Sequence, residues 1–144
     1  MNVNFTVFID KILSGEKRQT IRRASQKWEN VKAGDKLTLY TGLRTKQCRK
    51  LGEAKVASVH VVMFDTNNNK IFIFSPLGFL GCVEIAENEA RSIAVKDGFV
   101  LYDDFWNFFK KQYGRSGFLR MVIIRWHDFK RQSADTNEAE VTQQ

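Results

Sequence analysis

The chain has 144 residues, of which 43% are hydrophobic and 27% are charged, and its formal net charge is +7. A chain of this length can bury a core without a disulfide or a metal. Cys48 and Cys82 are far apart, and neither histidine has a neighbouring ligand pattern, so no zinc site is expected. No leader pattern and no apolar run of ~18 residues is present, which predicts a protein of a reducing cytoplasm without a membrane partner.

The positive charge is concentrated in the first 132 residues. The segment 133–144 has three acids and no Lys or Arg, so the preceding residues carry a formal charge of +10. Such an excess favours phosphate backbones through Coulomb attraction and counterion release, although basic side chains can also serve solubility alone. Because the segment 133–144 lacks apolar groups, we expect one domain over 1–132 and a disordered polar tail.

The first half of the chain predicts one helix followed by strands. Apolar residues at helical spacing from Phe5 to Leu13 indicate a short helix that ends in a left-handed Gly15. The residues Asn67, Asn68 and Asn69 tolerate the left-handed conformation and predict the turn of a hairpin. Strands are expected over 18–22, 36–40, 55–64 and 70–74.

The second half predicts two helices and a final strand. One helix is expected over 84–96, with Glu84 and Glu87 near its positive end and Gly98 as its C-terminal cap. An amphipathic helix over 101–113 is expected to begin at Asp103 or Asp104, and a strand over 118–126 follows. Strands on both sides of a helical pair indicate an α+β domain with a curved or closed sheet.

The segment 15–22 brings an amine, a hydroxyl and a guanidinium together just past the first predicted helix. Desolvation or nearby cations, here Arg18, Arg22 and Arg23, can make a lysine such as Lys17 a general base or a nucleophile. Thr20 can be a nucleophile activated by Lys17 if the chain bends between them, because residues three apart in a regular strand face opposite sides. Arg22 can bind phosphate or carboxylate bidentately. The alternatives are a solvated lysine, a strand-forming threonine and a surface salt bridge.

Asp97 lies at the C-terminal end of the predicted helix 84–96. The helix dipole disfavours a carboxylate there by a few tenths to about 1 kcal/mol. Either Asp97 bonds the turn that it makes with Gly98, or it points at a cation such as Lys17.

A basic loop is predicted after the strand that ends at Tyr40. Its four cations, with an aromatic residue nearby, suit single-stranded RNA, where phosphates bind the cations and bases stack on rings. A solvated loop is the alternative. Trp28 and Trp126 are either stacking platforms or core residues. The cations are Arg44, Lys46, Arg49 and Lys50.

The pattern Gly-x-Lys-x-x-Thr-x-Arg at 15–22 resembles the signature of the ASCH family, a group of small PUA-like domains linked to RNA and modified nucleosides. The resemblance covers the chain from about Phe5 to Trp126. It implies a stand-alone domain of the bacterial or phage type, with a small PUA-like curved sheet or pseudo-β-barrel and flanking helices. Similar landmarks follow in the family's order at 31–37, 39–45, 97–99, 105–109 and 121–126.

Some ASCH proteins are similar to an amidohydrolase that removes the acetyl group of N4-acetylcytidine with a lysine, a threonine and a glutamate. Lys17 and Thr20 match by motif, whereas Asp97 falls nearest the glutamate and is one methylene shorter. The leading hypothesis is a basic cleft, lined by these residues and Arg22, that binds RNA or a modified nucleoside. The alternatives are a hydrolase of acylated cytidine or of RNA, and a protein-interaction module; neither RNA binding nor hydrolysis requires a cofactor. The expected binding residues are Arg18, Arg22, Arg23, Tyr40, Arg44, Lys46, Arg49 and Lys50.

Overall fold

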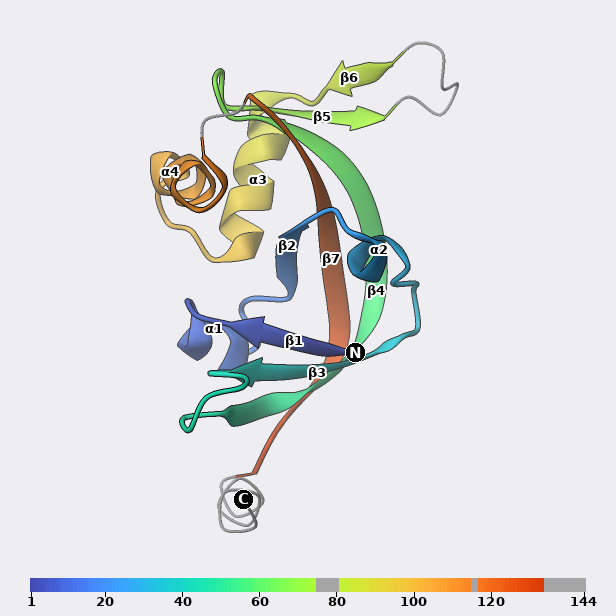
Figure 1. Cartoon of the computed structure of the whole chain (residues 1–144), viewed down its shortest axis with the longest axis vertical. Helices are drawn as coiled ribbons and strands as arrows, with labels where there is room; N and C mark the ends of the chain where they lie inside the picture. Colours follow the sequence, from blue (N-terminus) through green and yellow to red (C-terminus); the bar gives the residue numbers. More distant parts are fainter. Residues whose placement is uncertain (75–80, 115–116, 134–144) are drawn as a thin grey trace. The chain divides into compact units, whose positions relative to one another are not determined.

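A computed structural model of the chain describes residues 1–74, 81–114 and 117–133 (Figure 1). The predicted tail therefore lies, apart from Ser133, outside the described residues. The chain forms two compact units, and the long strands β4 (Arg49–Asp65) and β7 (Phe118–Arg131) contribute residues to both. Unit 1 comprises Met1–Arg18, Lys32–Ser58 and Arg125–Gln144, and unit 2 comprises Gln19–Val31 and Val59–Ile124.

The strands form a mixed sheet of seven strands, which is open over the described part of the chain. Its main path runs β1-β3-β4-β5-β6, while β7 pairs with both β4 and β2. With four helices, this arrangement confirms the predicted α+β class. The remaining strands are β1 (Asn2–Phe5), β2 (Gln19–Arg23), β3 (Lys36–Thr41), β5 (Lys70–Phe74) and β6 (Cys82–Glu84).

Unit 1 is built on the alternation of β3, in which Leu37 and Leu39 are fully buried and Lys36 is exposed. Successive side chains of a strand point to opposite faces, so one face of β3 belongs to the core and the other to the surface. β3 pairs antiparallel with β4, and Lys36 lies directly opposite Lys55. These basic residues therefore share the outer face of unit 1.

Unit 2 packs α3 (Glu87–Asp97) and α4 (Tyr102–Tyr113) against strands. Helix α3 contacts β2, β5 and α4. The ring of Phe64 from β4 lies 5.2 Å from that of Trp106 and 5.3 Å from that of Phe109, and all three side chains are buried. This aromatic core fixes α4, and the contact between α3 and β2 places the last turn of α3 beside the predicted motif.

The predicted N-terminal helix is too long. Residues Asn2–Phe5 instead form β1, which pairs in parallel with β3 and buries Val3 and Phe5. Helix α1 covers only Ile9–Leu13 and follows Phe8, whose φ is 60°. The helical spacing of the apolar residues was misleading because pairing with a distant strand decided the conformation. The left-handed Gly15 is confirmed, with φ of 82°.

The two later helices begin at other residues than predicted. Glu84 lies on β6, opposite Phe72, so helix α3 starts at Glu87 and not at Glu84. Leu101 is the N-terminal cap of α4, and no side chain caps it; Asp103 and Asp104 lie in the first turn instead. Acidic groups are favourable in a first turn because of the helix dipole, so they need not cap it.

The strands of the central region are closest to the prediction. The hairpin between β4 and β5 is confirmed, with Asp65 opposite Lys70 and a left-handed Asn69 in the turn. However, β4 begins at Arg49, which was assigned to a loop. The sequence also did not predict helix α2 (Gln26–Glu29) or β6.

No helix in the described ranges is long and apolar enough to cross a membrane.

Candidate functional site

Part of the motif is buried, which is unusual for polar side chains. Six polar or charged residues among those described are buried, and four of them come from the predicted motif or its acid. Lys17 is 4% exposed and Thr20 is 3% exposed. Lys17 is therefore not a solvated surface lysine. The four are Lys17, Gln19, Thr20 and Asp97.

Strand β2 in unit 2 presents Thr20 and Arg22 on one face, because residues two apart in a strand point the same way. The Nε of Arg22 donates a hydrogen bond to Oγ1 of Thr20 over 3.0 Å. Burial lowers the pKa of Arg22, while the nearby Tyr113 and Asp97 raise it. A guanidinium remains charged in proteins, so Thr20 has a permanent cation at its oxygen.

Asp97 is the last residue of α3, and the left-handed Gly98, with φ of 115°, caps the helix. The carboxylate is therefore buried where the helix dipole opposes it. Two groups of unit 2 offset this cost. The Nε2 of Gln19 donates to the carbonyl oxygen of Ile93 over 3.0 Å and to Oδ1 of Asp97 over 3.4 Å, and Arg22 supplies positive charge.

Four arginines of unit 2 lie over aromatic rings, and three of them lie on the paired strands β2 and β7. We call these three arginines and their rings the Arg–aromatic cluster. The distance from the guanidinium carbon to the ring centroid is 5.0 to 5.9 Å in the three pairs. Each pair joins a cation to a π face, a combination that recurs in proteins that bind single-stranded nucleic acid. The pairs are Arg22 with Trp28, Arg23 with Tyr113, and Arg120 with Phe74.

Local hydrogen bonds hold this cluster. The hydroxyl of Ser25 accepts from the backbone N–H of Trp28 over 3.4 Å and caps α2. Arg120 donates to Glu29 from its Nε over 2.8 Å, and its carbonyl oxygen accepts from the N–H of Ala24. Lys27 adds another cation, with its Nζ 4.6 Å from the centroid of the Trp28 ring.

Lys17 belongs to unit 1, whereas Thr20 and Asp97 belong to unit 2. The Nζ of Lys17 lies 5.3 Å from the ring centroid of Phe8 and 5.8 Å from that of Phe5. The rings place the ammonium in an apolar environment with favourable cation–π geometry. Lys17 lies two residues before Gln19, the first residue of β2.

The predicted basic loop is only partly a loop. Arg44 is left-handed, and the turn around it and Lys46 is closed by Thr45, whose Oγ1 donates to the carbonyl oxygen of Gly42 over 2.6 Å. Arg49 and Lys50 instead lie on β4, because this strand extends to pair with Thr41 and Tyr40 at the end of β3.

The other predicted residues of unit 1 have structural partners. Lys50 forms an ion pair with Glu53 at 3.0 Å. The Nε of Arg18 donates to the carbonyl oxygen of Gly15 over 2.9 Å. Trp126 is buried and belongs to the core, whereas Trp28 is half-buried.

Several residues of the site were not predicted from the sequence. Gln19 lies inside the motif, but its partner Asp97 is 78 residues away along the chain. Arg120 joins the cluster only because β7 pairs with β2, which no local pattern indicates. The Ser25 cap, three residues before Trp28, was the one local signal that was available.

Over the residues described, no group of three or more His, Cys, Asp and Glu side chains is placed to hold a metal ion.

No protein-family model and no curated protein matches the chain. Solved structures of ASCH from Zymomonas mobilis are similar to it. The crystal structure is 14% identical with a TM-score of 0.51, and the match covers 90% of this chain and 68% of that chain. Two mutants of that protein give TM-scores of 0.52 and 0.51 at 14% identity; the second match covers 93% of this chain and 75% of that chain. At this identity the likeness shows the fold, which is ASCH-like, as the motif predicted.

Proposed function

We propose that unit 2 binds single-stranded RNA, or a modified nucleoside within it, at the Arg–aromatic cluster. The observation that carries this proposal is the pairing of three arginines with three aromatic rings. The formal charge of +10 on residues 1–132 supports it, because phosphate binding by basic side chains releases counterions. The motif resemblance implies the same class of ligand.

The cluster offers separate partners for the phosphates and the bases of a nucleotide strand. Arg23 and Lys27 are exposed and can bind phosphates, and the half-buried rings of Trp28 and Tyr113 can stack with bases. Arg22 can stack through its plane, as guanidinium groups do with unpaired bases. Thr20 is buried and accepts the hydrogen bond from Arg22, so it positions this guanidinium.

Substitution of Trp28 tests the proposal. Trp28→Leu should weaken binding of a fluorescein-labelled uridine octamer by about tenfold, since loss of one stacked base removes roughly 1 to 3 kcal/mol. Tyr102→Leu is the matched control, because Arg91 lies 4.5 Å from the centroid of the Tyr102 ring outside the cluster. Fluorescence anisotropy at 50 mM and 200 mM salt gives both the affinity and its salt dependence.

RNA binding should also quench the fluorescence of Trp28, which can be followed because Trp106 and Trp126 are buried. An octamer that binds without quenching, or equal affinities for Trp28→Leu and Tyr102→Leu, would show that the cluster is not the RNA site. Affinity that does not change with salt would rule out phosphate contacts.

A second candidate is hydrolysis of N4-acetylcytidine, favoured by the hydrogen bond from Arg22 to Thr20. A guanidinium that donates to a hydroxyl oxygen stabilises the alkoxide formed when the hydroxyl loses its proton, and so promotes nucleophilic attack on an acyl carbon. The resemblance implies that Lys17 is the base. Release of acetate from N4-acetylcytidine by the purified chain is the direct measurement.

A further inference from the structure

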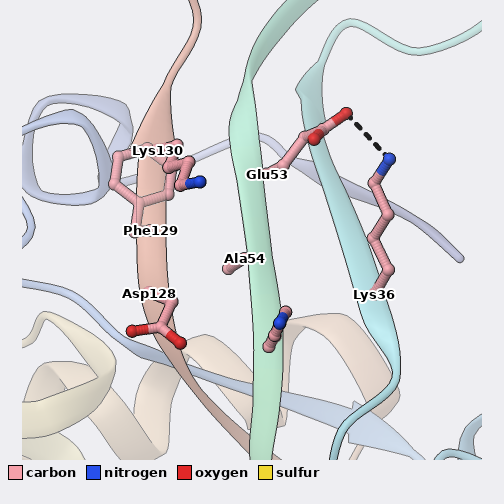
Figure 2. Close-up of a pocket in the computed structure, with 7 residues that line it drawn as sticks. Lys36, Glu53, Ala54, Asp128, Phe129 and Lys130 are labelled. Atoms are coloured by element: carbon pink, nitrogen blue, oxygen red, sulfur yellow. Dashed lines mark ion pairs between the residues drawn. The ribbon is translucent and has the colours of Figure 1, made fainter.

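A groove in unit 1 has no role in the proposed function. Its volume is about 460 Å³. Its walls come from three strands, β3, β4 and β7, and its lining combines lysines with an aromatic ring and a small side chain (Figure 2). The lining residues are Lys36, Glu53, Ala54, Lys55, Asp128, Phe129 and Lys130.

The lysines of the groove are arranged at an electrostatic cost. Lys36 lies directly opposite Lys55 in the antiparallel pair of β3 and β4. Like charges at opposed positions of a sheet are destabilising. Neither Lys55 nor Lys130 has an ion pair with another residue in the described ranges. A negatively charged ligand would relieve this repulsion.

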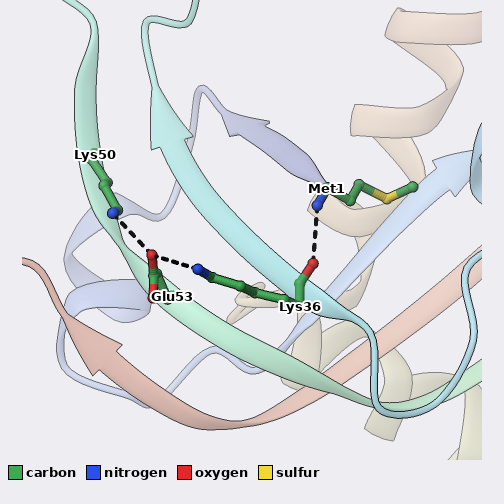
Figure 3. Close-up of polar contacts among 4 residues, drawn as sticks. All are labelled: Met1, Lys36, Lys50 and Glu53. Carbon is green, nitrogen blue, oxygen red and sulfur yellow. Dashed lines mark hydrogen bonds and ion pairs between the residues drawn. The ribbon is translucent and has the colours of Figure 1, made fainter.

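Two carboxylates, Glu53 and Asp128, partly offset these charges, and Oδ2 of Asp128 lies 2.9 Å from Nδ1 of His127. Glu53 Oε1 lies 3.0 Å from the Nζ of Lys50 and 3.1 Å from that of Lys36 (Figure 3). The hydrogen bonds from Lys50 and Lys36 lower the pKa of Glu53, so it remains ionised at neutral pH. The lining therefore has three lysines, Lys36, Lys55 and Lys130, against the two carboxylates, which leaves the groove with a formal charge of +1.

Phe129 gives the groove an aromatic wall. The ring is half-buried against the backbone of Gly52 on β4, so closely that a Cβ at position 52 would lie 2.6 Å from Cε1 of Phe129. This packing holds part of the ring against β4, and the exposed remainder of the half-buried ring is available to a ligand. A fixed aromatic ring beside ammonium groups suits a base and its phosphate.

We propose that this groove binds the phosphate groups of a ribonucleotide. Lys36, Lys55 and Lys130 supply the cations, as compact point charges that match phosphate oxygens in several orientations. Phe129 supplies the apolar contact for the base. The site lies within unit 1 and uses none of the residues of the Arg–aromatic cluster, so it is a separate ligand site. The nucleotide is either free or part of an RNA strand.

Backbone amide shifts in NMR titrations test the site. Uridine 5′-monophosphate and a uridine octamer are added in separate titrations, and shifts are expected for the amides of Lys36, Lys55, Phe129 and Lys130. Shifts with both probes assign a nucleotide site, and shifts with the octamer alone assign a site for a strand. If neither probe shifts these amides, the proposal is wrong.

Charge variants provide the second test. Lys55→Gln/Lys130→Gln should reduce octamer affinity by at least about fivefold and lower the salt slope by about 1.4, which corresponds to two phosphates on a single strand. Lys32→Gln/Lys70→Gln removes the same charge outside the groove and is the matched control. Equal effects of the two double substitutions would overturn the proposal.

Glu53→Gln gives a result of the opposite sign. It removes one of the two internal anions and should tighten octamer binding about two- to fivefold at low salt, since it frees Lys36 and Lys50 for phosphate. Unchanged or weaker binding would contradict the role of these lysines. Quenching of Trp28 by the octamer should persist in Lys55→Gln/Lys130→Gln, which distinguishes failure of this site from failure of the site in unit 2.

Discussion

The side chain of Gln19 holds the carboxylate of Asp97 in unit 2. Its Nε2 donates to Oδ1 of Asp97 over 3.4 Å and to the carbonyl oxygen of Ile93 over 3.0 Å. Both side chains are buried, at 1% and 5% exposure. The amide of Gln19 therefore satisfies a carbonyl oxygen in the last turns of α3. It also orients Asp97, the acid to which the motif resemblance assigns a catalytic role.

Replacement of Gln19 should destabilise the fold. Gln19→Leu leaves a buried carbonyl oxygen and a buried carboxylate without this donor, so the free energy of unfolding should fall by about 1 to 3 kcal/mol. Gln112→Leu, on the exposed side of α4, is the control and should have little effect. Urea denaturation followed by circular dichroism measures both; equal stabilities would show that the amide contributes nothing.

Lys17 and Thr20 should be non-additive if they act together in hydrolysis. Lys17→Ala and Thr20→Ala should each remove nearly all release of acetate from N4-acetylcytidine, and the double variant should be no worse than either, because members of a catalytic unit fail together. Lys32→Ala, an exposed lysine of unit 1, controls for loss of charge. Additive losses in kcat/KM would mean that the two residues contribute independently.

The length of the acid at position 97 should set the hydrolysis rate. Asp97→Glu restores the longer acid of the resembling amidohydrolase and should raise kcat, since a displacement of about 1 Å can change a rate on the order of a hundredfold. Asp97→Asn keeps the shape, removes the charge and should lower kcat. Absence of acetate from the unsubstituted chain and from folded Asp97→Glu would eliminate the hydrolase and leave RNA binding to be judged alone.

Asp65 should make the stability of the hairpin dependent on pH. The hydrogen bond from the Asn68 side chain does most to lower its pKa, and backbone N–H groups of Asn67 and Asn68 add to this, while burial opposes them. In the folded chain the pKa of Asp65 lies below its unfolded value of about 3.9. The ionised carboxylate therefore contributes stability above about pH 3.9, and this contribution is lost as the pH falls through the pKa of the folded state. Asp65→Asn should therefore be less stable at pH 7 by about 1 to 2 kcal/mol and nearly equal at pH 2.

The control for this measurement is Glu16→Gln, an exposed residue outside the helices and strands. Denaturation in urea at pH 7, 5, 3 and 2 gives the free energy of unfolding of each variant. A difference between the original chain and Asp65→Asn that stays constant from pH 7 to pH 2 would contradict an ionised hydrogen-bond acceptor at this turn.

Sequence reasoning succeeded where the conformation was decided locally. Gly15 was expected in the left-handed conformation, Asn69 was one of three asparagines expected to tolerate it, and Gly98 was expected to cap a helix. All three have positive φ, which few other residue types adopt. Strand β5 was predicted with its observed bounds, because turn residues precede a run of strand-forming residues.

Sequence reasoning failed where distant segments decide the structure. Asn2–Phe5 is a strand because β3 pairs with it, and Arg49 is in a strand because Thr41 lies opposite. The Arg–aromatic cluster has the same origin, since Arg120 and Arg23 come together through the pairing of β2 with β7. Local periodicity contains no information on such pairings.

The close packing of Phe129 on Gly52 restricts how this region can diverge. A Cβ at position 52 would collide with the backbone carbonyl oxygen of Lys130 and would lie 2.6 Å from Cε1 of Phe129. A smaller residue at position 129 would remove only the second collision, so any side chain at position 52 also requires a displaced strand end. Glycine should therefore be retained at position 52 among homologous chains that keep β4 paired with β7, whatever residue stands at position 129.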